Sequence, residues 1–474
     1  MTSFAVSASE ILARLENLRA ADAPTHGGRV LSYVYDSGLA ELDELASSAM
    51  RLVQPVNGLD PTTFSSVAVM ESEVVGFMRS LLGGDDDVVG SVTTGGTESC
   101  LLAVKTARDN WTGERMPRLL APATVHAAFH KAAHYFGLEL DLVPVDADGS
   151  VSAQSLIERM GPDVAIVVVS APSYPFAVLD PVVEVAAAAL ARGIACHVDA
   201  CIGGLVLPFW PDLPPWDLRV PGVTSISADL HKFGYAPKGA SVLLHRGRDR
   251  QRAQYFATTQ WPGYPVINPT MLGSKSAAPL AAAWAISQAL GVDGLAALAD
   301  SCRRSTDRLV ALIGSIEGLR VVGTPVGPLF AVATDESVPA SRQVDPHHWA
   351  DEARALGWFI QQQPGLTQSD GSRLPHTTHL TITPVTEGIL PLLSDALIQA
   401  ADSARGVPRA AAAAVPFDGE LDSESAWGLL QALGIGVGGL PDRMAPLMAL
   451  IETLPAPVAE RLLVEVLARV VEPR

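Results

Sequence analysis

Residues 225–239 read Ser-Ile-Ser-Ala-Asp-Leu-His-Lys-Phe-Gly-Tyr-Ala-Pro-Lys-Gly, with a lysine, Lys232, at the centre of the stretch. The first four residues alternate small and apolar side chains, as in a strand that enters a core. The chain then bends at Lys232 and passes through a turn that contains Gly and Pro before a second apolar run at 240–244. Aromatic neighbours surround the lysine, so desolvation is expected to lower the pKa of its amine. A lysine with a lowered pKa is suited to form an imine with a carbonyl compound.

For Lys232 taken alone, a surface lysine after a strand would be the better interpretation, but two other motifs favour a chemical role. His-Val-Asp-Ala-Cys-Ile-Gly-Gly at 197–204 places Asp199 at the end of an apolar strand. Thr-Thr-Gly-Gly-Thr-Glu-Ser at 93–99 places a glycine-rich turn before a helix. A lysine, an aspartate and a phosphate-binding turn are the groups with which proteins hold pyridoxal 5′-phosphate.

Together the motifs resemble those of the sphingosine-1-phosphate lyases, a group of fold-type I pyridoxal-phosphate enzymes to which the group II amino-acid decarboxylases are related. The resemblance extends from about Gly28 to Leu-Pro-Asp-Arg at 440–443 and is most specific around Lys232. It implies that Lys232 forms the imine with the cofactor and that Asp199 meets the pyridine nitrogen. An anion at this position keeps the nitrogen protonated, so the ring stays an electron sink. The alternative for Asp199 is a capping residue after a strand.

The resemblance also implies how the cofactor phosphate is held. The turn at Gly95, Gly96 and Thr97 precedes a helix, whose free N–H groups and dipole favour an anion. His231 resembles a histidine that reaches the same phosphate. Ser274, in Gly-Ser-Lys at 273–275, resembles a Gly-Ser-Arg segment that enters from the other subunit, with lysine keeping the charge but losing the bidentate geometry of arginine. The sequence therefore predicts a homodimer with shared active sites.

His126 opens a run with two further histidines, His130 and His134, at helical spacing. This spacing could suit a metal, but no carboxylate or cysteine with similar spacing accompanies it, so no metal is expected. The resemblance implies instead that the His126 ring stacks on the pyridine ring of the cofactor.

Three residues near the N-terminus match positions that face the substrate in the resembling family. Tyr35 corresponds to a tyrosine at the substrate entrance, although packing is the commoner role of a tyrosine. Asn57 matches the asparagine of an Asn-Pro-Leu-His-Pro pattern, whereas Asp60 stands in the place of its histidine. An ionised aspartate repels a phosphate, at a cost on the order of 1 kcal/mol, so Asp60 weakens the case for a phosphorylated substrate.

Two more residues are candidates for proton transfer or anion binding. Tyr174, in Ser-Ala-Pro-Ser-Tyr-Pro, matches a substrate-contacting position, and a depressed pKa would let its phenol exchange a proton with a substrate hydroxyl. Lys238 matches a second family lysine that could lower that pKa or hold an anion, the alternative being a solvated turn residue. Arg373 could hold an α-carboxylate but matches no motif.

The apolar pattern predicts an α/β fold of type I, a large domain with a mostly parallel sheet between helices plus a smaller α+β domain. Ligands of such sheets bind beyond the carboxyl ends of the strands, which Asp199 and Lys232 follow. The predicted large-domain strands are 88–92, 138–143, 164–169, 194–198, 223–228 and 241–244. The predicted divisions are an N-terminal arm (1–60), a large cofactor-binding domain (61–292), a small domain (293–404) and a helical extension (405–474).

Composition limits the partners and the compartment. Of 474 residues, 48% are hydrophobic, and 33 basic against 51 acidic residues give a net charge of −18, which argues against nucleic acid or an anionic membrane as the main partner. The longest apolar runs, 164–169 and 182–191, are too short to span a membrane, so no membrane anchor is predicted. The four cysteines show no metal spacing, which suits reduced thiols in the cytoplasm.

The leading hypothesis is a pyridoxal-phosphate-dependent carbon–carbon lyase that cleaves a small-molecule amine by a retro-aldol reaction. The main alternative is decarboxylation of an L-amino acid by the same groups, in which a cation for the carboxylate would matter more than a phosphate pocket. A third is a catalytically silent scaffold, against which the intact Lys232, Asp199, His126 and 95–96 turn argue.

Overall fold

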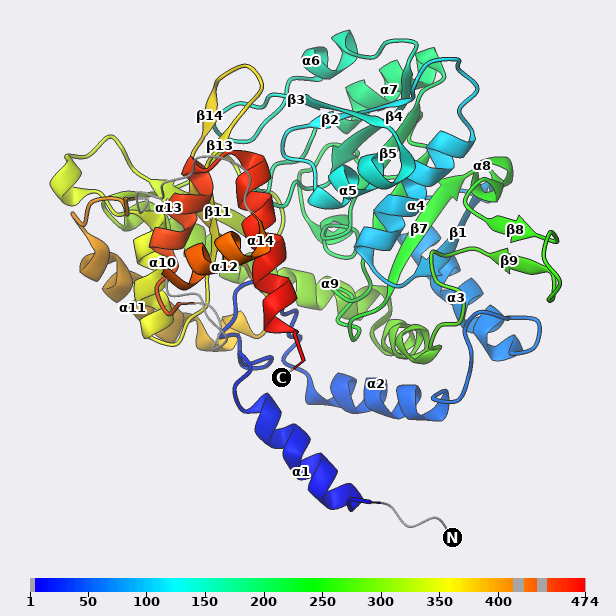
Figure 1. Cartoon of the computed structure of the whole chain (residues 1–474), viewed down its shortest axis with the longest axis horizontal. Coiled ribbons are helices and arrows are strands. Elements are labelled where there is room, and N and C mark those ends of the chain that lie inside the picture. The colour runs from blue at the N-terminus through cyan, green and yellow to red at the C-terminus, as the bar shows by residue number, and fades with distance from the viewer. Residues whose placement is uncertain (1–4, 412–421, 433–440, 474) are drawn as a thin grey trace.

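A computed structural model of the chain describes residues 5–411, 422–432 and 441–473. Its larger part is built around a seven-stranded sheet in the order β1-β7-β6-β5-β4-β2-β3 (Figure 1). Pairs from β3 to β6 are parallel, whereas β7 is antiparallel to both β1 and β6. The predicted mostly parallel sheet is confirmed. Its strands are β1 (Val88–Thr93), β2 (Arg118–Pro122), β3 (Glu139–Val143), β4 (Val164–Ser170), β5 (Ala195–Asp199), β6 (Ser225–Ala228) and β7 (Ser241–Arg246).

Helices cover both faces of this sheet. Strand β4 is buried at every position, with Val167 and Val169 in the core beneath one face and Ile166 and Val168 in the core beneath the other. This two-residue alternation explains why the strand reads as a continuous apolar run. The helices are α3 (Ser65–Leu81), α4 (Gly96–Asp109), α5 (Ala127–Phe136), α6 (Ala153–Glu158), α7 (Val182–Arg192) and α8 (Arg248–Arg252), with a 3₁₀ turn η1 (Leu207–Phe209).

Strand β2 was not predicted from the sequence. It is short, Pro117 precedes it and Pro122 ends it, so the local pattern resembles a loop. Burial decides the outcome, because Leu119, Leu120 and Ala121 are fully buried between β3 and β4.

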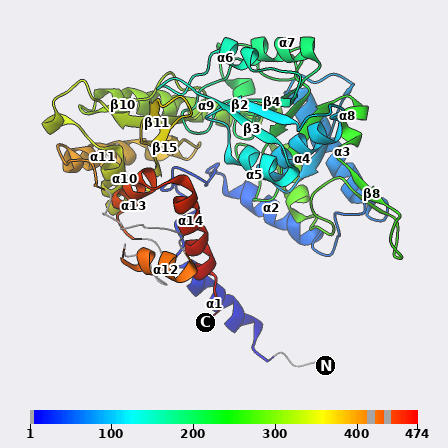
Figure 2. The ribbon, with the colours of Figure 1, turned by 45° about the horizontal axis from the view of Figure 1, so that its top comes forward.

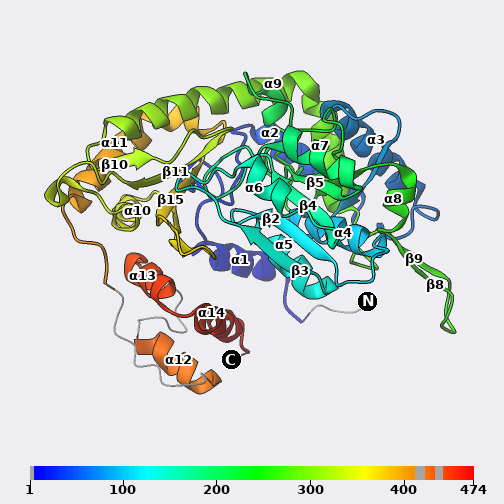
Figure 3. The same ribbon diagram turned by 90° about the horizontal axis from the view of Figure 1, so that it is seen from above.

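A long helix, α9 (Ala278–Ser315), joins the large domain to the small one (Figure 3). It is kinked at Gly291, where φ is 55°, beside the predicted boundary at 292/293. By its length and composition α9 could cross a membrane. The apolar runs at 164–169 and 182–191 are too short to do so. It packs against α2 (Ala40–Leu52) and α3, and side chains such as Ile286 and Leu309 are buried, as in a core helix of a folded domain.

The small domain is an antiparallel sheet covered by helices. Its four strands have the order β10-β11-β15-β12, and residues of α9, α10 and α11 complete its core. The strands are β10 (Leu319–Val321), β11 (Leu329–Thr334), β12 (Gln361–Gln363) and β15 (Thr377–Thr381). The helices are α10 (Pro346–Ala355) and α11 (Thr386–Ala404), with a 3₁₀ turn η2 (Ala340–Arg342). A hairpin of β13 (Leu366–Thr367) and β14 (Arg373–Leu374) extends from it.

Three further segments lie at the periphery. The helix α1 (Ala8–Arg19) has no buried residue. A hairpin of β8 (Phe256–Thr258) and β9 (Val266–Asn268) projects from the large domain. The C-terminal module, defined as α12 (Ser423–Ala432), α13 (Ala445–Thr453) and α14 (Ala456–Val470), meets the small domain where α13 packs beside α10 (Figure 2).

Candidate active site

A cavity of about 540 Å³ lies beyond the carboxyl ends of β5 and β6. The topology brings Lys232 to this edge because β6 ends at Ala228, four residues before it. Six residues predicted from the sequence line this cavity: Gly95, Gly96, Thr97, His126, His231 and Lys232. The structure thus gathers side chains from loops that are far apart in the chain.

The glycine turn fits a phosphate. Helix α4 begins at Gly96 without a side-chain cap, so the N–H groups of its first turn are available to an anion. A Cβ atom at Gly96 would lie only 2.6 Å from Asp229 Oδ2 and 2.9 Å from Cys201 Sγ. Glycine is therefore required there, because any side chain would fill the floor of the cavity.

Lys232 forms an ion pair with Asp229, whose Oδ2 lies 3.0 Å from Nζ. Burial acts to lower the pKa of Lys232, but nearby anions, Asp229 first, raise this pKa well above its ordinary value. The predicted lowering of the pKa is therefore wrong, because the sequence did not show where the Asp229 carboxylate would point. Asp229 is 1% exposed, and its Oδ1 atom is buried without a hydrogen-bond partner. An unpartnered carboxylate oxygen in the floor of the cavity fits a bound polar group.

Replacing Asp229 with asparagine should lower the pKa of Lys232, because desolvation would no longer be opposed by the adjacent anion. More of the amine would then be neutral at pH 7, and the ligand-free variant should react with pyridoxal phosphate about tenfold faster than wild type at this pH. Stopped-flow absorbance from pH 6 to pH 9 measures the effect. Asp163→Asn, at the opposite end of the sheet, is the matched control. Identical profiles for wild type and Asp229→Asn would contradict this account of the ion pair.

Asp199 ends β5 and is 7% exposed. Its Oδ1 accepts a hydrogen bond from the Cys201 N–H at 3.1 Å. Burial opposes ionisation, yet the charge of His126, a hydrogen bond from the Cys201 side chain and the charge of Lys232 hold the pKa of Asp199 below its ordinary value. The carboxylate is therefore ionised at neutral pH, as an aspartate that holds a protonated pyridine nitrogen must be.

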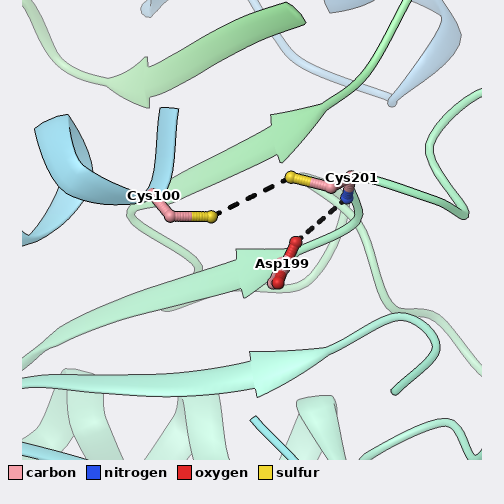
Figure 4. A group of neighbouring side chains, drawn as sticks. All are labelled: Cys100, Asp199 and Cys201. Carbon is pink, nitrogen blue, oxygen red and sulfur yellow. Dashed lines mark hydrogen bonds between the residues drawn. The ribbon is translucent and has the colours of Figure 1, made fainter. Parts of the chain in front are cut away.

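Two thiols lie beside Asp199 (Figure 4). Cys100 Sγ on α4 and Cys201 Sγ are 3.9 Å apart. These two sulfur atoms and a carboxylate oxygen of Asp199 all lie within 4.8 Å of one another. The spacing along the chain does not show this group, because the two cysteines are 101 residues apart. Burial raises the pKa of Cys100, and the hydrogen bond with Cys100, followed by burial, raises the pKa of Cys201, so both thiols stay protonated.

His126 is the N-cap of α5, and its Nδ1 atom accepts a hydrogen bond from the Ala128 N–H at 3.1 Å. Desolvation lowers the pKa of this imidazole, which favours a neutral ring. All three histidines are exposed, but only His126 lines the cavity, whereas His130 and His134 lie on α5 outside it. A neutral, fixed imidazole suits stacking on a flat cofactor.

Tyr174 lies at the boundary of the two domains. Its hydroxyl donates to Gln361 Oε1 at 2.6 Å, and its ring stacks on His379 with centroids 4.1 Å apart. Burial raises the pKa of Tyr174 well above its ordinary value. The depressed pKa that proton exchange by this phenol would need is therefore not met, and the phenol is neutral at physiological pH.

Tyr35 and Lys238 lie near Lys232. The Tyr35 ring meets Phe233 edge to face at 5.2 Å, and burial raises the pKa of Tyr35 to about 12. Lys238 Nζ lies 4.5 Å from the centroid of the Tyr35 ring and donates to the His231 carbonyl at 3.1 Å. Burial and then the charge of Lys232 lower the pKa of Lys238 to about 8. The Lys238 side chain is exposed, yet its amine contacts the Tyr35 ring and the His231 carbonyl, so it is not a freely solvated turn residue.

Asn57, Asp60 and Ser274 lie outside the residues that line this cavity. Asn57 Nδ2 donates to Ser274 Oγ at 3.2 Å, so these two predicted residues form a pair at the surface. Asp60 accepts hydrogen bonds from the backbone and hydroxyl groups of Thr62 and Thr63, which lower the pKa of Asp60 to about 2. Its carboxylate therefore stabilises its own turn and is ionised.

Sequence reasoning missed four residues that shape the site. Asp229 lies three residues before Lys232, and this spacing was the available signal. Glu98 accepts from the Thr94 N–H at 2.6 Å and the Met271 N–H at 2.6 Å, which ties the glycine turn to the 271–272 loop. Gln361 and His379 carried no local signal, because they come from another domain.

The fold and the site define a fold-type I pyridoxal-phosphate-dependent enzyme. Residues 53–322 match the profile described as the pyridoxal-dependent decarboxylase conserved domain. Residues 405–469 match a C-terminal domain of pyridoxal-dependent enzymes that has been proposed to be helix-turn-helix. The chain belongs to the pyridoxal-dependent decarboxylase family, and several of its relatives in this family are sphingosine-1-phosphate lyases.

Two such relatives differ in how much of their length is matched. The chain is 37% identical to a sphingosine-1-phosphate lyase of Dictyostelium discoideum, over 63% of this chain and 58% of that protein. It is 34% identical to the one of Arabidopsis thaliana, over 82% of this chain and 72% of that protein. The chain thus spans less than two thirds of the Dictyostelium protein.

Solved structures agree on the fold. A sphingosine-1-phosphate lyase from Burkholderia pseudomallei superposes with a TM-score of 0.79 and 31% identity, covering 92% of this chain and 96% of that one. A glutamate decarboxylase from Lactobacillus brevis shares the fold with a TM-score of 0.74 and 18% identity, over 85% of this chain and 94% of that one.

Proposed function

We propose that this chain is a pyridoxal-phosphate-dependent carbon–carbon lyase that cleaves an amino alcohol phosphate, or a related amine, into an aldehyde and a smaller amine. The observation that carries the proposal is the single cavity in which Lys232, the α4 N-terminus and His126 meet, with Asp199 close to His126 and Lys232. Similarity to a solved lyase over 92% of the chain supports the reaction type.

The protein groups have separable tasks. When bound, the cofactor withdraws electrons from the bond that breaks. Lys232 would hold its carbonyl carbon, Asp199 its ring nitrogen, and the first turn of α4 with His231 its phosphate. His126 would lie flat against the ring.

Retro-aldol cleavage also requires removal of a hydroxyl proton. Tyr174 donates its own proton to Gln361, so lone pairs of the phenol oxygen are free to accept a hydrogen bond from a substrate hydroxyl and orient it. The high pKa of Tyr174 makes the phenol unsuited to take that proton. Lys238, with a pKa of about 8, has a neutral fraction near physiological pH and is the better base.

Decarboxylation of an L-amino acid uses the same cofactor groups and is the alternative. It would need a cation for the substrate carboxylate. Arg373, the arginine considered from the sequence, instead pairs with Glu452 at 2.5 Å on α13. This engagement favours the lyase.

The discriminating experiment incubates the purified protein separately with a phosphorylated long-chain amino alcohol and with a panel of L-amino acids. Aldehyde without CO₂ supports the lyase, and CO₂ alone overturns it. A protein that contains no cofactor, shown by no absorption near about 420 nm, would support a silent scaffold.

We also propose that the enzyme is a cytoplasmic homodimer. Its four cysteines are free and buried, which suits a reducing compartment. The β8–β9 hairpin exposes large apolar side chains, among them Phe256, Trp261 and Ile267, and leads directly into the segment that contains Ser274. Such a patch suits an interface with a second copy that receives Ser274 near its cofactor.

Ile267→Glu should therefore convert the dimer to a monomer and reduce activity, because it places a charge in the interface. Ile267 is 64% exposed in the single chain. Leu392→Glu on α11, where the side chain is 61% exposed, is the matched control and should leave the dimer intact. Analytical ultracentrifugation measures the mass. A fully active wild-type monomer would contradict the proposal.

A further inference from the structure

Tyr174 is held by two residues that are neighbours on adjacent strands of the small domain. Gln361 on β12 pairs with His379 on β15 in the sheet register. Gln361 accepts the Tyr174 O–H at 2.6 Å, and His379 stacks on the ring with an interplanar angle of 22°. His379 is fully buried, burial lowers its pKa to about 3, and its Nε2 atom bonds to Thr381 Oγ1 at 2.9 Å. The small domain therefore fixes both the ring and the hydroxyl of Tyr174.

The same strand binds the residue that follows Tyr174. Gln363, which projects from the same side of β12 as Gln361, donates through Nε2 to the Pro175 carbonyl at 2.9 Å. Gln361 and Gln363 also line a second cavity, of about 430 Å³, together with His126 and Tyr174. The position of β12 therefore determines where the Tyr174 hydroxyl lies relative to the face of the His126 ring that would stack on the cofactor.

Strand β12 is in turn bound to the C-terminal module. Gln362, on the opposite side of the strand, donates through Nε2 to Asp351 Oδ1 at 3.1 Å. The Asp351 carboxylate also accepts the Met444 N–H at 2.8 Å and the Ala445 N–H at 3.0 Å, at the N-terminus of α13. Asp351 is 4% exposed, so one buried carboxylate joins β12 to the first turn of α13.

A second contact joins the module to the neighbouring hairpin. Glu452 on α13, whose side chain is 1% exposed, pairs with Arg373 of β14 and with Arg409. Gln368 of the same hairpin exchanges two hydrogen bonds with the backbone of Val145 in the large domain, at 2.8 and 2.7 Å. The charged groups of Glu452, Arg373 and Arg409 therefore pair with one another within the protein.

We propose that Gln361 is a positioning residue for Tyr174, and that the C-terminal module keeps Gln361 in place through Asp351. This inference rests on the proposed lyase function, in which Tyr174 orients the substrate hydroxyl. It gives residues 441–453 a role in the reaction although they lie outside the cavity that holds Lys232.

The test compares Gln361→Leu, which removes the acceptor, with Gln361→Glu, which keeps an acceptor oxygen at the same reach. Gln361→Leu should lower kcat about tenfold, the worth of one well-placed hydrogen bond, with cofactor absorbance and KM near those of wild type. Gln361→Glu should recover most of kcat, because its carboxylate oxygen can accept the Tyr174 O–H as the Gln361 amide oxygen does. A kcat for Gln361→Leu within twofold of wild type would overturn the role of Gln361.

Asp351→Ala tests the contribution of the module. It should lower kcat several-fold, as Gln361→Leu does, with KM and cofactor absorbance near those of wild type. Glu424→Gln, which breaks an ion pair with Arg469 inside the module at 2.7 Å, is the matched control and should keep wild-type kinetics. If Asp351→Ala lowers only the melting temperature and leaves kcat unchanged, the coupling through α13 is refuted.

The outcomes separate this inference from the proposed function. Each variant is assayed for aldehyde and for CO₂, as is the wild type. A wild type that forms neither product refutes the lyase and its alternative, whereas an active wild type with an equally active Gln361→Leu refutes only the positioning role.

Discussion

Replacing Lys232 with alanine is expected to lower aldehyde formation by about 10⁴-fold or more, a loss typical of removing a covalent catalytic group. The Lys232 amine would form the covalent bond to the cofactor, whereas Gly96 and His126 would only contact the cofactor. Borohydride reduction of the wild type followed by peptide mapping should place the cofactor on the peptide that contains Lys232. Attachment to another lysine would contradict the assignment.

The variant needs a control for folding, because it leaves Asp229 buried without its partner. Breaking a buried ion pair in this way costs on the order of 3–5 kcal/mol. The double variant Lys232→Ala with Asp229→Asn removes both charges and should fold well, as followed by circular dichroism, yet stay inactive. Lys105→Ala on α4, where the amine pairs with Asp109 at 2.7 Å, should keep wild-type activity. An active double variant would show that Lys232 is not required.

The sequence was sufficient to predict the parts of the site that depend on local motifs. Gly95 and Gly96 follow β1 directly, Asp199 ends β5 and Lys232 follows β6, so each was placed by the strand before it. Sheet topology then brings the carboxyl ends of parallel strands to one edge, which is why these groups gather in space.

The contacts of Tyr174 could not be predicted in the same way. Gln361 is 187 residues from Tyr174 and lies in another domain, so no local pattern connects them. The pKa shift predicted for Lys232 was wrong for a related reason. It depends on the direction in which the Asp229 carboxylate points, and this direction is not encoded in the spacing of residue types. Strand β2 was missed because its prolines resemble loop signals.

Replacing Asp199 with asparagine is expected to lower kcat by about 10²–10³-fold while the cofactor stays attached to Lys232. An amide has the shape of the carboxylate but cannot keep the ring nitrogen protonated, so the ring withdraws electrons less well. The neighbours of Asp199 hold its pKa below the ordinary value. Loss of its charge therefore requires a pH below about 4, and Asp199 should add no acid limb to the wild-type profile between pH 5 and pH 9.

Asp180 supplies the matched control, because it is a second buried aspartate near the end of β4. It is 3% exposed, its Oδ2 accepts the Ser170 N–H at 2.7 Å, and burial raises its pKa to about 7. An asparagine imitates the protonated form that Asp180 already populates near neutral pH, so Asp180→Asn should retain wild-type kcat and cofactor content. Steady-state kinetics with cofactor absorbance compares the two variants. Equal activity of Asp199→Asn and Asp180→Asn would show that a buried anion at the ring nitrogen is unnecessary, and would remove the basis for assigning Asp199 to the cofactor.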